Sequence, residues 1–330
     1  MPNDARAVLV APDSFKGTFR ASEVAAAIGR GLESVVAAAP DLMPVADGGE
    51  GTLEILLLAL GGETAGADVC DALRRPTSAA FGLVEDGSTA IVETAQAIGL
   101  PQIKQSERDA EAASSYGAGQ LVAAAAQSGA RRIIVAVGGS ASSDGGSGAI
   151  EAIEAAGGIG ASELVVCCDV NTTFERAAEV FGPQKGADAA AVERLTARLN
   201  ELAASFPRDP RGVEMSGCAG GLSGALWANY DATLEPGARF VLSALEADQR
   251  IKAARAVIVA EGRLDRTTLE GKIAAEIAVR ARQRGVPCYA IVGSNGLEPI
   301  DQRILDLQAV IEATTLEEVE QAGREIAAYL

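Results

Sequence analysis

The chain has 330 residues, enough for one large domain or two of ordinary size, each with its own apolar core. Acidic residues outnumber basic ones 45 to 28, and the net charge of -17 excludes a nucleic-acid partner, which would need lysine and arginine against its phosphates. Histidine is absent, so catalysis must use carboxylates, hydroxyls, lysine, arginine, thiols or backbone amides, which favours magnesium and phosphate chemistry.

The first third of the sequence alternates predicted strands with predicted helices. An apolar strand at 7–10 precedes a helix from about Ser22, whose apolar residues recur at helical spacing. A short strand at 42–45 follows, and then an apolar helix at 53–60 that a pair of glycines ends. This order is typical of βα units.

The middle of the chain has a different sequence pattern. Residues 62–100 form short alternating segments, and Glu-Asp-Gly-Ser at 85–88 predicts a hairpin turn between antiparallel strands. The helical pattern resumes at 110–127, followed by a strand at 132–137 and a helix from about Ala149. The remaining predicted elements are a strand at 164–170, a helix at 187–206, a strand at 255–265, a helix at 269–284, strands within 287–296 and near 309–311, and a terminal helix.

The order of these elements predicts an α/β fold with two domains. Apolar residues make up 48% of the chain and aromatic residues only 4%, which suits helices packed on Rossmann-like or flavodoxin-like parallel sheets. Because the pattern of parallel βα units occurs at both ends of the chain and that of antiparallel strands in the middle, we expect one domain to be inserted into the other. The expected outer domain comprises 1–61 and 255–330, and the inserted domain, with its hairpin, comprises 62–254.

The five cysteines have no C-x-x-C spacing and form an odd set, which favours reduced thiols over a disulfide framework or a zinc site. No stretch reaches the roughly 18 apolar residues that a membrane span needs, and no signal-peptide pattern opens the sequence. We therefore expect a cytoplasmic protein without a membrane or nucleic-acid partner. A homodimer is left open.

Four polar loops directly follow apolar strands, at 12–18, 138–148, 261–265 and 293–296. In open α/β sheets, ligands bind beyond the carboxyl ends of the strands, where glycine allows close backbone approach. Glycine-rich turns are also ordinary connections, but the serines of 138–148 offer more hydrogen-bonding groups than a turn needs. The sequence lacks a G-x-x-x-x-G-K-[ST] loop, which excludes a Walker-type nucleotide site.

Two lysines in these and similar loops are candidate anion ligands. Lys16 lies beside Gly17 and ahead of a helix, and Lys185 lies in a loop framed by glycine and proline. Each has an ordinary alternative, a solvated loop lysine for Lys16 and a helix-to-helix turn for Lys185.

Carboxylates near the same strand ends have two interpretations as well. Asp47 and Glu50 are either acids near a helix start or ligands of Mg²⁺, which takes one or two carboxylates. Glu261, Arg263 and Asp265 alternate after a predicted strand. They form either a surface ion pair or a clamp on developing charge with a base or a metal ligand.

Several strings together resemble the glycerate kinases of the bacterial glycerate 2-kinase type. Their order along the chain, from residue 8 to about 295, matches that family. The strings are APDSFKGT, PVADGGEGT, GGSASSDGG, DVN, VFGPQKGAD, GCAGGLSGAL and EGRLDRTTLEGK.

The resemblance implies ATP-dependent phosphorylation of D-glycerate, at its 2-hydroxyl, with Mg²⁺ and on a two-domain α/β scaffold. Phosphate and nucleotide contacts are expected from Ser14, Gly17, Gly138, Gly139, Ser140, Asp144, Gly145 and Lys185. The expected catalytic residues are Asp47, Asp265, Arg263 and Lys16, and the expected metal ligands are Asp47, Glu50 and Glu261. A kinase for another small hydroxy acid, or a binding protein without turnover, are the alternatives.

Overall fold

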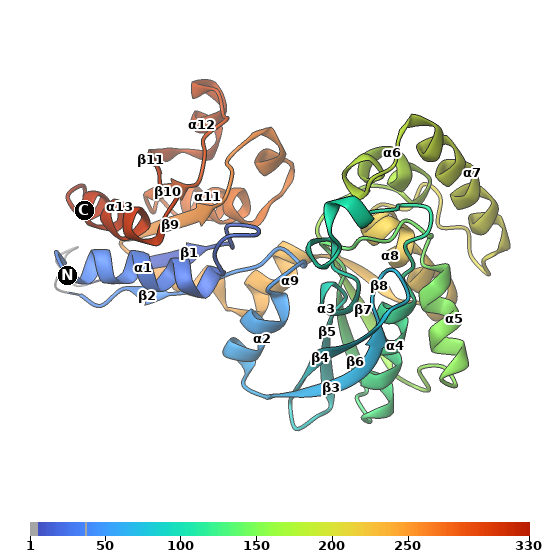
Figure 1. Cartoon of the computed structure of the whole chain (residues 1–330). Helices are drawn as coiled ribbons and strands as arrows, with labels where there is room; N and C mark the ends of the chain where they lie inside the picture. The colour runs from blue at the N-terminus through green and yellow to red at the C-terminus, as the bar shows by residue number, and fades with distance from the viewer. Residues whose placement is uncertain (1–5, 37) are drawn as a thin grey trace. The chain divides into compact units, whose positions relative to one another are not determined.

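Strands and helices alternate along the chain as an α/β fold requires, in a computed structural model that describes residues 6–36 and 38–330 (Figure 1). The described residues form two compact units. The first comprises those up to Asp47 together with Val241–Leu330, and the second comprises Gly48–Phe240. The second unit thus interrupts the first in sequence.

The first unit contains a parallel sheet of five strands in the order β11-β10-β9-β1-β2. Because β2 lies on one side of β1 and the later strands lie on the other, this is the 2-1-3-4-5 order of flavodoxin-like sheets. The elements are β1 (Val8–Pro12), α1 (Ala21–Glu33), β2 (Asp41–Leu42), α10 (Ala247–Ala253), β9 (Ala256–Glu261), the 3₁₀ helix η6 (Arg266–Glu270), α11 (Ile273–Gln283), β10 (Cys288–Val292), α12 (Pro299–Leu305), β11 (Leu307–Glu312) and α13 (Leu316–Ala327).

Helices cover both faces of this sheet. Alternate residues of β1, β9 and β10 pack against α1 and α13 in one apolar cluster, and α11 contacts the same three strands. Helices α1 and α13 approach closely at Gly31, where a Cβ atom would come within 2.2 Å of the carbonyl oxygen of Glu320. The predicted parallel sheet with helices on it is confirmed.

The second unit contains a mixed sheet of six strands in the order β3-β4-β5-β6-β7-β8. Strands β3, β4 and β5 are antiparallel, and β5 to β8 are parallel. The elements are α2 (Thr52–Leu60), β3 (Glu63–Cys70), β4 (Pro76–Val84), β5 (Thr89–Glu93), α3 (Ala95–Ile98), η2 (Leu100–Gln102), η3 (Gln105–Glu107), α4 (Tyr116–Gln127), β6 (Arg132–Ala136), α5 (Ser147–Ala155), β7 (Glu163–Cys168), η4 (Phe174–Arg176), α6 (Ala177–Phe181), η5 (Pro183–Lys185), α7 (Ala189–Ser205), α8 (Cys218–Tyr230), β8 (Thr233–Pro236) and α9 (Gly237–Ala244), which crosses the unit boundary.

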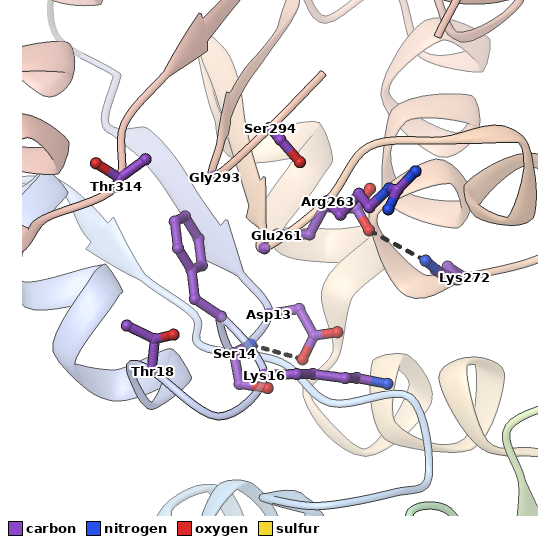
Figure 2. Close-up of a pocket in the computed structure, with 12 residues that line it drawn as sticks. Asp13, Ser14, Lys16, Thr18, Glu261, Arg263, Lys272, Gly293, Ser294 and Thr314 are labelled. Carbon is purple, nitrogen blue, oxygen red and sulfur yellow. Dashed lines mark hydrogen bonds and ion pairs between the residues drawn. The ribbon is translucent and has the colours of Figure 1, made fainter. Parts of the chain in front are cut away.

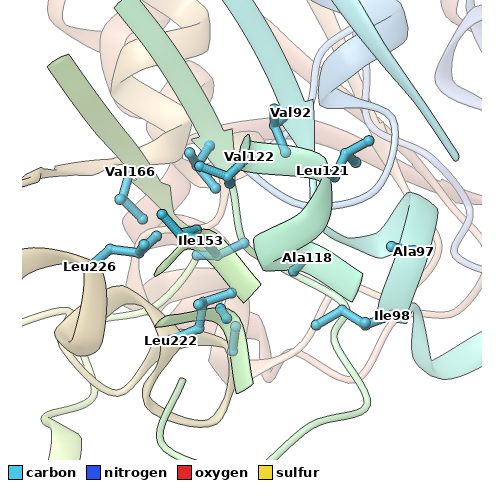
Figure 3. Packing of buried hydrophobic residues seen from close by; sticks show 14 of the residues in the cluster. Val92, Ala97, Ile98, Ala118, Leu121, Val122, Ile153, Val166, Leu222 and Leu226 are labelled. Atoms are coloured by element: carbon cyan, nitrogen blue, oxygen red, sulfur yellow. The ribbon is translucent and has the colours of Figure 1, made fainter. Parts of the chain in front are cut away.

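Aliphatic side chains fill the core of this unit, as the low aromatic content requires. Residues of β5, β6 and β7 pack against α4, α5 and α8 (Figure 3). The hairpin predicted at 85–88 joins β4 to β5, and its residues Glu85, Asp86 and Gly87 all have positive φ. This confirms the antiparallel segment.

The unit boundaries lie at 47/48 and 240/241, whereas the sequence pattern predicted them at 61/62 and 254/255. Helix α2 belongs to the second unit because it packs on β4 and β5. Helix α10 belongs to the first unit because it packs on α11, and its Arg250 hydrogen-bonds Asp41. Division of the chain into domains at the predicted residues stays a prediction.

Three predicted elements begin or end elsewhere in the structure. The helix predicted at 110–127 begins at Tyr116, because Ser114 and Ser115 turn to hydrogen-bond Asp144. The strand predicted at 255–265 ends at Glu261, and the following helix begins at Ile273, after η6. Over the described part of the chain, no helix is long and apolar enough to cross a membrane.

Candidate active site

A cavity of about 430 Å³ opens beyond the carboxyl ends of β1, β9 and β10 in the first unit (Figure 2). Strands β1 and β9 are parallel neighbours, and the order in which strands are added to the sheet reverses between them, which is the place where open α/β sheets bind ligands. The cavity is lined by Asp13, Ser14, Phe15, Lys16, Thr18, Glu261, Gly262, Arg263, Lys272, Gly293, Ser294 and Thr314. Three of the four loops singled out from the sequence therefore meet here.

Two buried carboxylates lie side by side at the strand ends. The register pairs Pro12 with Ala260, so Asp13 and Glu261 are the next residues on neighbouring strands. Oδ1 of Asp13 accepts a hydrogen bond of 2.7 Å from the backbone N–H of Ser14. Burial, with the nearby Asp47 charge, raises the pKa of the Asp13 carboxyl, and burial raises the pKa of Glu261 to about 7.

A short helix braces the Glu261 carboxylate. The Thr268 hydroxyl donates to Glu261 Oε1 at 3.0 Å, and it accepts the backbone N–H of Asp265 at 3.2 Å. The Asp265 carboxylate in turn accepts from the Thr267 hydroxyl and backbone N–H, which, with Lys272 and Arg263, lowers its pKa. Asp265 therefore caps η6, and it is not among the residues that line the cavity.

Three cations line the same cavity, among them the predicted Lys16 and Arg263. The Lys16 ammonium lies 3.5 Å from a carboxylate oxygen of Asp47. Nε of Arg263 lies 3.0 Å from Asp265, and the Arg263 side chain is 70% exposed. The ordinary ion pair considered for Arg263 and Asp265 is thus present, while Arg263 also faces the cavity.

In the second unit, a glycine- and serine-rich loop follows β6 and leads to α5. Lys185 is 3% exposed, and its ammonium donates to the Ser142 carbonyl at 2.5 Å and to the Ser140 hydroxyl at 3.3 Å. Burial lowers the pKa of Lys185 to about 8. Lys185 thus ties its own loop to the serine loop.

Asp144 has a structural role within that unit. Oδ2 accepts from the backbone N–H and the hydroxyl of Ser115, at 2.8 and 2.9 Å, and from the backbone N–H of Gly148 at 3.2 Å. Oδ1 accepts from the backbone N–H of Gly146. The carboxylate therefore joins the start of α4 to the start of α5, where a negative charge is favourable.

Comparisons with known proteins bear on what this arrangement does. The model of the glycerate kinase family matches residues 8–157 and 154–330. The chain belongs to the glycerate kinase family. A glycerate kinase of Halalkalibacterium halodurans is 35% identical over 96% of this chain and 94% of its own length, and the glycerate 2-kinase of Escherichia coli is 34% identical over 87% and 85%.

Structure comparison agrees with the sequence comparison. The crystal structure of a glycerate kinase 2 candidate from Salmonella typhimurium LT2 superposes with a TM-score of 0.80 and 31% identity, covering 98% of each chain. The resemblance inferred from the ordered motifs is thereby confirmed, and so is the α/β fold with two parallel-dominated sheets.

Within this glycerate kinase fold, the predicted site residues fall into two groups. In the first unit, Ser14, Lys16, Glu261 and Arg263 line the cavity, Asp47 and Asp265 pair with its cations, and Gly17 follows Lys16 with free space around it. In the second unit, Gly138, Gly139, Ser140, Asp144 and Gly145 lie in the serine loop that Lys185 contacts. The binding and catalytic roles of both groups stay predictions.

The predicted metal ligands are divided between the units, since Asp47 and Glu261 belong to the first and Glu50 to the second. Among the described residues, no group of three or more carboxylates or thiols is placed to hold a metal ion. A complete protein cage for magnesium is therefore absent from the part of the chain that the structure describes.

Sequence patterns in this glycerate kinase did not reveal three charged residues. Asp13 directly follows the first apolar strand, so the same strand-end reasoning that selected Lys16 would have found it. Lys272 reaches the cavity only because η6 turns the chain back toward it, and no pattern in the sequence predicts that turn. Glu93 is the last residue of β5 and is 2% exposed. The sequence feature that could have revealed it is a charged residue at the end of an apolar strand.

Proposed function

We propose that the chain catalyses the ATP-dependent phosphorylation of D-glycerate at its 2-hydroxyl, giving 2-phosphoglycerate. Membership of the glycerate kinase family supports the reaction, and the name of the Escherichia coli relative supports the position. The observation that carries the proposal is the cavity at the β1/β9 strand ends, where three cations lie beside two buried carboxylates. Phosphoryl transfer needs this kind of positioned charge more than an imidazole.

Each charged group then has a role in the transfer. Arg263 or Lys16 pairs with the carboxylate of glycerate, and the other of these two cations neutralises charge on the transferred phosphoryl group. Asp47 or Asp265 accepts the proton of the attacking hydroxyl. The serine loop and Lys185 of the second unit serve the phosphates of the nucleotide.

Magnesium is part of this proposal. Mg²⁺ is held by one or two carboxylates together with substrate phosphates, and it supplies positive charge against the β- and γ-phosphates. The two buried carboxylates that line the cavity, Asp13 and Glu261, suit such an ion better than a complete cage would. The groups proposed to hold it are Glu261 and Asp47, which is buried and pairs with Lys16 of the cavity. Glu50, in the second unit, is retained only as a predicted ligand.

Two other functions are weighed against this one. A kinase for another small hydroxy acid would use the same charges with different pocket contacts. A binding protein without turnover would be expected to lack an acid or a cation of the motifs, yet Lys16, Asp47, Lys185, Arg263 and Asp265 are all present. A cytoplasmic location and a homodimer stay predictions.

An assay of ADP release with D-glycerate, L-glycerate and glycolate, followed by phosphorus NMR of the product, tests the proposal. Either Asp47→Asn or Asp265→Asn, whichever removes the base, should lower kcat by about 100-fold or more, because a positioned acid or base contributes about 10²–10⁴-fold. The exposed Asp68→Asn serves as the matched control. Release of ADP that does not depend on any of these acids would contradict the proposal, and full turnover in both variants would remove the two carboxylates from it.

A further inference from the structure

The three cations of the cavity differ in how exposed they are and in how closely acidic side chains approach them. The Lys16 side chain is 63% exposed, whereas that of Lys272 is 31% exposed. Nε of Arg263 lies 3.0 Å from Asp265. The Lys272 ammonium faces Glu261, as Figure 2 shows, but lies 3.8 Å from it and 3.9 Å from Asp265, both outside hydrogen-bond distance. Among the residues that the structure describes, none accepts a hydrogen bond from the Lys272 ammonium.

The local fold fixes this lysine at the cavity. Lys272 is the N-cap residue of α11, and it follows Gly271, whose φ of 109° turns the chain out of η6. The capping box of Asp265 and Thr268 closes the other end of η6. The loop therefore returns to the end of β9, and Lys272 faces the same cavity as Glu261.

This arrangement leaves the Lys272 ammonium without a hydrogen-bond acceptor among the described residues. A lysine held near acids can donate three hydrogen bonds, and partial burial without acceptors costs free energy. Thr268 already occupies Oε1 of Glu261. A ligand oxyanion entering the cavity would supply the missing acceptors and would meet a compact point charge, the form in which lysine binds phosphate.

We propose that Lys272 is a ligand-binding residue of this cavity, donating hydrogen bonds to an oxyanion of the reactants. The inference rests on the proposed function, which supplies two sources of that chemistry, the phosphates of ATP and the carboxylate of glycerate. The competing explanation is that Lys272 only balances the charges of Glu261 and Asp265.

Equilibrium binding separates the two explanations. Calorimetry with ATP alone, and with D-glycerate alone, should give at least about tenfold weaker binding of one ligand to K272M, because a charge-assisted hydrogen bond is removed. The ligand that is weakened identifies the source of the oxyanion. K272R should recover part of the loss, and K252M, an exposed lysine of the same unit, should bind like wild type.

A second measurement needs no substitution. ATP and D-glycerate are each tested at about ten times the dissociation constant. The ligand that Lys272 binds should slow acetylation of Lys272, followed by mass spectrometry, about tenfold, while Lys252 reacts at an unchanged rate. This measurement distinguishes a ligand-binding Lys272 from a counter-ion even if K272M does not fold.

Unchanged binding of both ligands by K272M, or equal acetylation with and without both ligands, would overturn the inference. Recovery of wild-type binding in K272M/E261Q would also overturn it, since that result makes Lys272 a counter-ion. Absence of glycerate turnover in wild type would count against the proposed function alone, because the ATP arms still report on Lys272.

Discussion

Replacement of Glu93 tests how the second unit holds the segment that follows Asp47. Oε2 of this buried carboxylate accepts the backbone N–H groups of Gly51 and Leu53, at 3.0 and 3.1 Å, at the start of α2. The N-cap residue Gly51 has no side chain to do this. Glu93 therefore caps α2 from another element.

The expected loss follows from these two bonds. Hydrogen bonds to a charged group contribute about 1.5–3 kcal/mol each, so the loss of two in Glu93→Ala should lower the free energy of unfolding by about 3–6 kcal/mol. Glu93→Gln keeps one carbonyl oxygen for both N–H groups and removes the buried charge, so its loss should stay below about 1.5 kcal/mol.

The two variants also differ in their pH dependence. Burial raises the pKa of the Glu93 carboxyl above its ordinary value of 4.5, so the folded state holds this proton more tightly than the unfolded state does. The corresponding stability is present at low pH and is lost as pH rises through the raised pKa. Relative to wild type, Glu93→Gln should therefore gain stability as pH increases above about 4.5.

Urea unfolding followed by tryptophan fluorescence is a suitable assay, because the single tryptophan, Trp227, lies in α8 of the second unit. Glu163→Gln, at an exposed position of the same unit, is the control and should change the free energy by less than about 0.5 kcal/mol. An unfolding midpoint and slope for Glu93→Ala equal to those of wild type would refute the capping role.

Three further predictions follow from single contacts. Gly31→Ala should destabilise the first unit by about 1–3 kcal/mol, measured by circular dichroism on heating, because its methyl group meets the Glu320 carbonyl; a stabilised variant would contradict this contact. Burial lowers the pKa of Lys185 from 10.5 to about 8, so between about pH 8 and 10.5 the unfolded state binds more protons than the folded state. As pH rises through this range, the free energy of unfolding of wild type, measured with urea, should increase relative to that of Lys185→Met. A difference that stays constant with pH would contradict this prediction. Arg263→Met should raise KM for D-glycerate at least about tenfold in the ADP-release assay, and an unchanged KM would leave Lys16 as the carboxylate ligand.

Periodicity predicted β1, β9 and β10 well because these strands are continuous apolar runs, and it predicted the hairpin because the hairpin has a clear turn. It did not predict β8, Thr233–Pro236, which has no fully buried residue. It failed where side chains from elsewhere decide the backbone. The predicted helix start near residue 110 is wrong because Ser114 and Ser115 turn toward Asp144, a residue about 30 positions away. Likewise, the strand predicted at 255–265 ends at Glu261, so Arg263 and Asp265 lie beyond it.

Strand-end reasoning found part of the cavity for a geometric reason. The carboxyl ends of neighbouring parallel strands meet at one edge, so loops 12–18 and 261–265 had to approach each other once β1 and β9 paired. The sequence could not rank the charges within those loops, because exposure and hydrogen bonding depend on η6 and its capping box. Lys272 was missed for that reason, although it is the last residue of the motif EGRLDRTTLEGK.

The charge balance of the cavity explains how an acidic protein can bind anionic reactants. The whole chain carries -17, yet Lys16, Arg263 and Lys272 all line the cavity, beside Asp13 and Glu261. Asp47 and Asp265 pair with two of these cations from positions outside the lining. Net charge acts at long range and is screened beyond roughly 10 Å, whereas groups around a cavity act on the ligand at contact distance. Burial also raises the pKa of Asp13, which reduces the negative charge that opposes an anion there. We propose that this group of cations holds a phosphate of the reactants at contact distance, and that Glu261 is a ligand of the magnesium ion that the phosphate brings.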